Sequence, residues 1–337
     1  MINRLFFIEW LLFALLSFIF CILLSFRPIP NEGSDNDTGR YVRAFRDYCA
    51  NGFLEKKLLH ENLSYQIFYT AFYPACVIKS DRFFLFEVAM LVPLIFLFFA
   101  KWRNNTLFLS AGLTFSVYGL ELMTNAMRQG LATFFFLGSV GLIERHRKVA
   151  LLLGLIAGIA HISALAFFPF LLWISWKRLS MIEKYGWLLV LPIMLLFLFR
   201  INVELIIDAL DVLNKMFEDY REIYSLELKP SFLIFMSFPL FWIYIVRYLS
   251  HKINRTDIGN IETLAIIYSS LILAISYLIF PFIVYRFALL AVPLQIFLTA
   301  RSSSASTLTS AIIFFSMVIH LVFMVITTNH FDVLIYG

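Results

Sequence analysis

The chain is poor in charged residues. Only 15% of its 337 residues are Asp, Glu, Lys or Arg, against about 25% in ordinary soluble domains. Its hydrophobic share is 61%, well above the roughly 45–50% of soluble domains. The sequence also lacks the Walker loop and the GxGxxG, HExxH and GxSxG motifs, so ATP hydrolysis and hydride transfer are poor interpretations. The composition excludes a soluble domain and predicts a polytopic membrane protein.

Cysteine is scarce as well. Cys21, Cys49 and Cys76 form no CxxC pair and no spacing typical of a metal site, so we predict that they are packing residues. The net charge of +5 arises from Lys and Arg gathered in short turns, which is typical of cytoplasmic loops. It does not indicate nucleic-acid binding, and none is expected.

Apolar segments with about the length needed to cross the hydrocarbon recur along the chain. They fall at 5–26, 83–100, 106–123, 129–143, 149–176, 187–201, 231–249, 261–280, 287–300 and 308–327. We therefore predict an all-α polytopic membrane protein, a single integral membrane domain over 1–337 with about ten to eleven transmembrane segments. No metal and no cofactor is expected.

Basic turns set the orientation. We place the basic turns on the cytoplasmic side, namely 101–103, 145–148, 177–184, 252–255 and Arg301. This topology leaves two polar loops outside, at 27–80 and 202–230. Two conditions follow. Residues 61–80 must lie as an interfacial helix, and residues 149–176 must cross twice or re-enter with a break near His161. A single tilted helix over 149–176 is the alternative.

Both outer loops contain amphipathic patterns. In residues 38–50, Tyr41, Phe45 and Tyr48 share one face and the arginines another. Residues 205–220 place Ile206, Leu210, Leu213, Phe217 and Tyr220 together. We predict interfacial helices that roof a cavity.

Two lone arginines lie in turns that this topology puts outside, against the positive-inside bias. Arg128 lies in Asn125-Ala126-Met127-Arg128-Gln129-Gly130, and Arg286 follows Tyr285 in a second short turn. A guanidinium has a planar fork that suits phosphate. We interpret both as phosphate ligands; the alternative is an arginine that snorkels to the interface.

Candidate proton acceptors are few. His161 lies within a Gly/Ala-rich apolar stretch, where it is either a proton acceptor or a donor to a carbonyl freed by a helix break. Asp37 precedes the basic amphipathic helix, as a helix cap or as a catalytic base. Glu121 can pair with Arg128.

These pieces together resemble the EpsG-type, Wzy-like family of bacterial exopolysaccharide and O-antigen polymerases. The residues that carry the resemblance are Phe26-Arg27, Asp37-Thr38, Tyr41, Tyr65, Asn125, Met127-Arg128-Gln129, Leu131-Ala132, Arg145-His146-Arg147-Lys148, His161-Ile162-Ser163-Ala164-Leu165 and Tyr285-Arg286-Phe287. The spacing from Gly33 to Thr38 departs from the expected loop, so Asp35 competes with Asp37 as the matching acid.

The resemblance implies a GT-C-like, metal-independent glycosyltransferase of the bacterial inner membrane, with its site facing the periplasm or exterior. Its substrates would be oligosaccharides linked to undecaprenyl pyrophosphate, and membrane lipid, a chain-length regulator and a flippase would be its partners. The implied roles place Asp37 and His161 in catalysis. Pyrophosphate and lipid head groups would be bound by Arg128, Arg286, Arg40, Arg43, Gln129, Asn125 and Tyr285. A lipid-linked-sugar flippase or transporter, and an O-antigen ligase or membrane acyltransferase, are the competing interpretations.

Overall fold

The structure is a computed structural model. It describes residues 4–29, 37–52, 59–100, 102, 106–176, 239–240, 242–250, 260–279, 283–301 and 306–328. The predicted outer loop at 202–230, its amphipathic segment at 205–220 and the apolar segment at 187–201 lie outside these residues.

The described residues fold into helices joined by short turns. In chain order the helices are α1 (Arg4–Ser25), α2 (Asp37–Asn51), α3 (Leu59–Ala71), α4 (Tyr73–Ile78), α5 (Asp81–Phe99), α6 (Thr106–Thr114), α7 (Val117–Thr124), α8 (Met127–Leu142), α9 (Arg147–Ala160), α10 (Ile162–Leu165), α11 (Phe168–Trp176), α15 (Asn260–Ile279), α16 (Ile283–Arg301) and α17 (Thr307–Thr328). Residues 242–250 are helical too.

Four of these helices, α1, α5, α16 and α17, are long and apolar enough to cross a membrane. The α6–α7 pair, bent by 55°, would be a fifth crossing if it is one broken span. Large apolar side chains on α1 and α17 remain exposed, as expected for helices that contact lipid. The all-helical membrane class is therefore confirmed. The predicted total of about ten to eleven spans remains a prediction.

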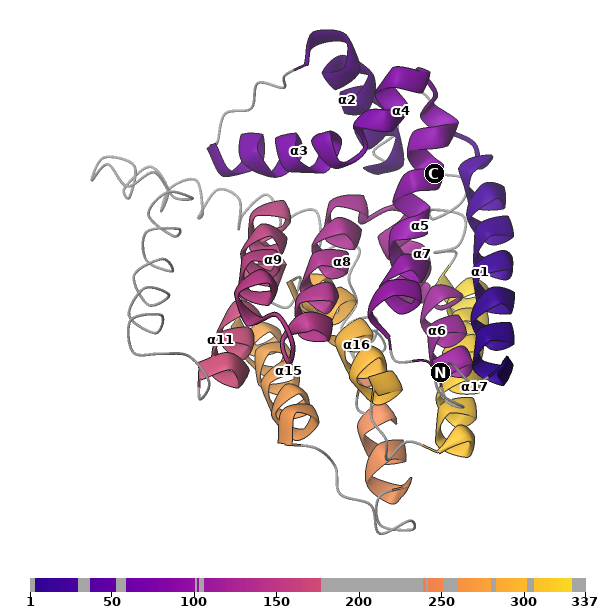
Figure 1. Ribbon diagram of the computed structural model, residues 1–337, viewed down its shortest axis with the longest axis vertical. Helices are drawn as coiled ribbons and strands as arrows, with labels where there is room; N and C mark the ends of the chain where they lie inside the picture. Colours follow the sequence, from indigo (N-terminus) through magenta and orange to yellow (C-terminus); the bar gives the residue numbers. More distant parts are fainter. Residues whose placement is uncertain are drawn as a thin grey trace, which may run out of the picture.

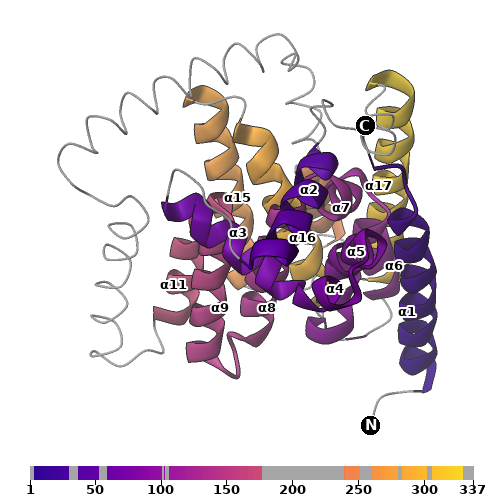
Figure 2. The ribbon, with the colours of Figure 1, turned by 90° about the horizontal axis from the view of Figure 1, so that it is seen from above.

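Three helices form a separate layer at one end of the upright bundle. Figure 1 shows α3 running across the ends of α8 and α9, with α2 and α4 beside it, and Figure 2 shows the same three helices lying over the bundle. We call α2, α3 and α4 the roof. Its α2 matches the amphipathic helix predicted at 38–50, because Tyr41, Phe45 and Tyr48 are all buried. The segment 61–80, predicted as one interfacial helix, is helical but divided at Phe72 into α3 and α4, and its position at the interface stays a prediction.

The bundle contains two broken helices. α9 ends at Ala160, His161 has extended backbone (φ −155°, ψ 128°), and the short α10 follows at once. This is the break that we predicted near His161. The break between α6 and α7, inside the apolar run 106–123, was not predicted. There Ser116 caps α7 by accepting from the Gly119 amide, and a Cβ at Gly119 would lie 2.2 Å from the Leu113 carbonyl oxygen.

Candidate functional site

Arg128 lies where the roof meets the bundle. It is in the first turn of α8, which folds back closely on α7; a Cβ at Gly130 would lie only 2.5 Å from the Leu122 carbonyl oxygen. The guanidinium points to the roof: Nε donates to the Tyr41 hydroxyl (3.3 Å), and Nη1 donates to Ser64 Oγ (3.3 Å). Its carbon lies 4.0 Å from the centroid of the Tyr65 ring.

The partners of Arg128 are all neutral. Other arginines of the chain have carboxylate partners, such as Arg247 with Glu262 and Arg301 with Glu144. Within the described residues, no carboxylate forms an ion pair with Arg128. An aromatic face and two hydroxyl groups hold the guanidinium in place but do not cancel its charge. The half-buried Arg128 is therefore fixed in orientation and electrostatically prepared for an anion.

Asp37 and Arg286 lie side by side, although they are far apart in the sequence. Asp37 opens α2, and its Oδ2 lies 3.9 Å from Nη2 of Arg286 near the start of α16. Its Oδ1 is 3.1 Å from Nη2 of Arg40 on the next turn. An acid in the first turn of a helix is also favoured by the helix dipole. The Asp37 carboxylate thus lies between Arg40 and Arg286. The Arg286 side chain is half-buried, so part of it remains accessible.

A polar network beneath Arg286 joins three helix ends. Gln129 donates from Nε2 to the Arg286 carbonyl oxygen. Tyr285 is hydrogen-bonded to the fully buried Glu121, to which Asn125 also donates (3.4 Å). Glu121 therefore pairs with Tyr285 and Asn125 in the structure, where sequence reasoning offered Arg128. These contacts fix the start of α16 against α7 and α8, and they hold Arg286 near Arg128's end of α8.

His161 contributes at the break between α9 and α10. Its Nδ1 accepts from the Ser163 amide (3.3 Å) and lies 2.8 Å from Ser163 Oγ. The imidazole therefore caps α10 as an acceptor, whereas the structural role that we weighed for it was that of a donor to a freed carbonyl. The residue before it, Ala160, accepts from Ser64 Oγ at 2.5 Å. Ser64 thus contacts both Arg128 and the His161 break, and sequence reasoning missed it.

The remaining predicted ligands lie on α2. Arg40 is exposed, with 61% of its side chain accessible, and it pairs with Asp37. Arg43 is half-buried one turn further along. Tyr41 points the other way, into the roof, and its carbonyl oxygen accepts from the Tyr69 hydroxyl (3.1 Å). Burial raises the pKa of the Tyr69 hydroxyl, so it stays protonated and can donate this bond.

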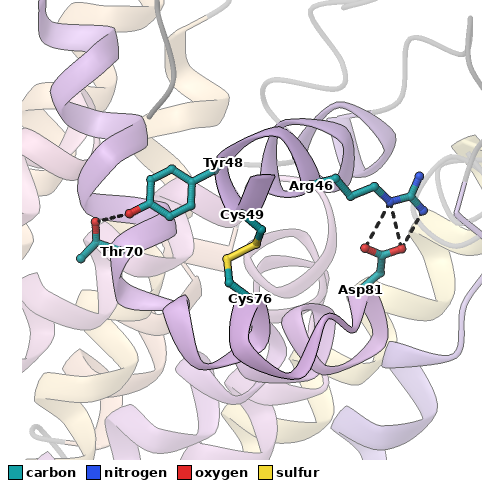
Figure 3. Close-up of a disulfide and its surroundings, with 6 residues drawn as sticks. All are labelled: Arg46, Tyr48, Cys49, Thr70, Cys76 and Asp81. Carbon is teal, nitrogen blue, oxygen red and sulfur yellow. Dashed lines mark hydrogen bonds and ion pairs between the residues drawn. A yellow bond between two sulfur atoms is a disulfide. The ribbon is translucent and has the colours of Figure 1, made fainter. Parts of the chain in front are cut away.

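The roof is fastened by a disulfide between Cys49 of α2 and Cys76 of α4, with Cα atoms 5.2 Å apart. Our prediction that these two cysteines are packing residues is wrong, because the pairing depends on helix packing across 27 residues and leaves no local spacing signal. Cys21 is buried and free. Figure 3 shows two further links, from Tyr48 to Thr70 (2.9 Å) and from Arg46 to Asp81 (2.6 Å).

Aromatic packing completes the attachment of the roof. The Phe45 ring of α2 stacks on the Phe84 ring of α5 with centroids 4.2 Å apart and planes within 10°. Tyr69 of α3 stacks on Tyr48 and on Tyr65, the ring that lies against Arg128. The position of Tyr65 thus depends on the packing of α2 against α3.

Fold and site together define a helical integral membrane protein with a cationic site beneath the roof. The chain belongs to the EpsG family, whose model matches residues 10–336. This confirms the resemblance read from the sequence. Membership suggests a polysaccharide-polymerase-like function, carried out by a membrane protein. Comparison with curated proteins and with solved structures finds no match to the chain.

Proposed function

We propose that the chain is a polysaccharide polymerase. It transfers a glycan from undecaprenyl pyrophosphate to a sugar hydroxyl of another lipid-linked repeat unit, at the outer face of a bacterial inner membrane. The family supports the polymerase class, and one observation carries the site: Arg128 is held by Tyr41, Ser64 and Tyr65 and has no carboxylate partner in the described part of the chain.

The leaving group determines what the site must do. When the bond between the anomeric carbon and the pyrophosphate oxygen breaks, negative charge develops on the pyrophosphate. Arg128 and Arg286 supply preorganised positive charge for it, and this stabilisation needs no metal ion. Asn125, Gln129 and Tyr285 hold the helix ends that carry these two arginines. Arg40 and Arg43, on the outer side of α2, then bind the head group of the second lipid.

The acceptor hydroxyl forms the new bond to the anomeric carbon and loses its proton to a base. Asp37 is our choice, because its carboxylate lies between Arg40 and Arg286 at the edge of the site. A pyrophosphate that binds Arg286 competes with Asp37 for the same guanidinium. Substrate binding would therefore release Asp37 to accept the proton. His161 orients the acceptor side through the Ser64 contact at Ala160.

Orientation is part of the proposal. The Cys49–Cys76 disulfide supports an extracytoplasmic roof, because disulfides persist on the oxidising side of a membrane. The basic turns support a cytoplasmic position for the opposite end. We further propose that residues 1–337 form one GT-C-like membrane domain with about ten to eleven spans, in which 27–80 and 202–230 are the two extracytoplasmic segments.

The test uses the purified full chain in detergent with lipid-linked repeat units. The wild type should convert them to longer lipid-linked glycans, Arg128→Gln should abolish this, and Lys79→Gln should not. Lys79 is exposed at the end of α4, so its variant removes the same charge without touching the contacts of Arg128. A wild-type protein that moves the lipid across vesicle membranes without extending any glycan would show a transporter and overturn the proposal. Extension that survives Arg128→Gln would overturn the assigned site.

A further inference from the structure

A second group of arginines lies away from Arg128, where α1 ends and α5 begins. Arg27 follows α1 and is only 5% exposed. Its Nη1 donates to the Leu24 carbonyl oxygen (3.1 Å), and its Nη2 donates to that of Thr124 (3.2 Å). Arg82, in the first turn of α5, donates from Nη1 to the carbonyl oxygens of Ser25 (2.9 Å) and Arg27. Both guanidinium groups thus surround the same helix end.

The positive charge here exceeds what the helix end can balance. The carboxyl end of a helix carries roughly half a negative charge, whereas two guanidinium groups bring two positive ones. In the described residues neither arginine has a carboxylate partner; Asp81, next to Arg82, is held by Arg46. Burial, and then the neighbouring charge of Arg82, lower the pKa of the Arg27 guanidinium to about 10. Within the described part of the chain the pair therefore lacks a counter-ion.

Donors remain free at this place as well. Nε of Arg27 is buried and makes no hydrogen bond. Arg82 uses only Nη1 for its two carbonyl contacts, so Nε and Nη2 can still donate. Arg82 is half-buried, which leaves it accessible to a ligand.

The surroundings face lipid. Phe26, between α1 and Arg27, is 68% exposed, and Leu23 one turn earlier is 67% exposed. The guanidinium carbon of Arg82 lies 5.9 Å from the centroid of the Phe26 ring. An exposed aromatic ring beside an arginine at the end of a spanning helix is where phosphates of membrane lipids lie.

We propose that Arg82, with Arg27 behind it, binds the phosphate of a membrane lipid at this end of α1, at a site separate from Arg128 and Arg286. The phosphate supplies the missing negative charge and accepts from the free nitrogens of Arg82, while the acyl or prenyl chains lie along the apolar face that ends at Leu23 and Phe26. Two sources share this chemistry: a glycerophospholipid and an undecaprenyl phosphate. The site does not depend on sugar transfer, so it stands or falls separately from the proposed function.

Native mass spectrometry of the delipidated full chain tests the proposal. Phosphatidylglycerol, undecaprenyl phosphate and inorganic phosphate are added in turn. We expect the wild type to bind at least one of the two lipids tightly and inorganic phosphate weakly. Arg82→Gln should lower the affinity for the more tightly bound lipid by roughly tenfold or more, which is the loss expected when one charged hydrogen-bonding partner is removed. Lys79→Gln should bind as the wild type does, and the lipid that loses more affinity in Arg82→Gln identifies the source.

If Arg82→Gln does not fold, Arg82→Lys is measured in its place. It keeps the charge that caps the end of α1 but loses the planar fork, so it should fold and still bind the lipid more weakly than the wild type. Unchanged affinity in whichever Arg82 variant folds would overturn the proposal. So would inorganic phosphate that binds as tightly as either lipid, because that is the behaviour of a soluble-anion site.

Discussion

Breaking the Cys49–Cys76 disulfide should loosen α2, the roof helix that carries both Asp37 and Tyr41. The two cysteines are 27 residues apart in the sequence. The chain-entropy relation for a loop of that length gives a stabilisation of about 3.5 kcal/mol, which corresponds to a roughly 400-fold change in the opening equilibrium of the closed segment. The exposed Arg46–Asp81 pair cannot replace it, because exposed ion pairs contribute at most about 1 kcal/mol.

The aromatic contacts decide what remains after reduction. Phe45, Tyr48 and Tyr69 are buried, so α2 should stay docked on average while it opens more often. Hydrogen exchange of the α2 amides, measured on the full chain before and after reduction, should therefore accelerate by up to a few hundredfold. Exchange in α9 should stay unchanged. Glycan extension should fall, because Arg128 would lose its contact with Tyr41 for part of the time.

A Cys21→Ser variant is the control, since Cys21 is free and buried in α1. The reasoning is refuted if α2 exchanges at the same rate once mass analysis shows that the disulfide is fully reduced. Protein isolated from cells with thiols blocked should also carry an intact Cys49–Cys76 bond, and free thiols at both positions would refute the extracytoplasmic roof.

Three other predictions concern the chemistry. Arg128→Lys keeps the charge but loses the planar guanidinium that contacts both Tyr41 and Ser64. The transition state should lose roughly 1–3 kcal/mol of stabilisation, so glycan extension should slow. Normal polymer length at normal expression would show that Arg128 only anchors the helix at the interface. Asp37→Asn should abolish transfer while the lipid-linked substrate still binds. His161→Gln should retain activity, because the glutamine side-chain oxygen can accept from the Ser163 amide. An active Asp37→Asn beside an inactive His161→Gln would make His161 the base. Extension should persist in excess chelator, and loss restored by magnesium or manganese would reveal a metal site.

Local patterns predicted the parts of the fold that depend on local physics. The period of apolar residues in 38–50 placed Tyr41 and Phe45 on the buried face of α2, because a helix has only one face to bury. The break at His161 was predicted because the basic turns on both sides of 149–176 were placed on the same side of the membrane, so that this long apolar run had to cross twice or re-enter. The break at Ser116 escaped prediction, because the apolar run around it is continuous and only the tight contact at Gly119 marks it.

The contacts that build the site were beyond sequence reasoning, because they join residues far apart in the chain. Neither the Asp37–Arg286 pair nor the position of Ser64 between Arg128 and Ala160 has a local signature. The sequence marked Arg128 as unusual only because it breaks the positive-inside bias. What makes it a candidate ligand is the absence of a carboxylate beside it in the described residues, and this is a property of packing.

The charges around the site argue for a pyrophosphate rather than a neutral sugar as its first ligand. Among the described residues, Asp37 is the carboxylate that pairs with Arg40 and Arg286, and none pairs with Arg128, so the resting site carries excess positive charge. Holding that positive charge near the membrane interface is unfavourable unless a bound anion neutralises it. A pyrophosphate carries negative charge on both phosphates and can engage Arg128 and Arg286 together, which turns Asp37 from a counter-ion into an available base. A neutral glycan would leave Asp37 paired and the arginine charge uncompensated. Under the proposed mechanism, the pyrophosphate therefore binds before Asp37 can accept the proton of the acceptor hydroxyl.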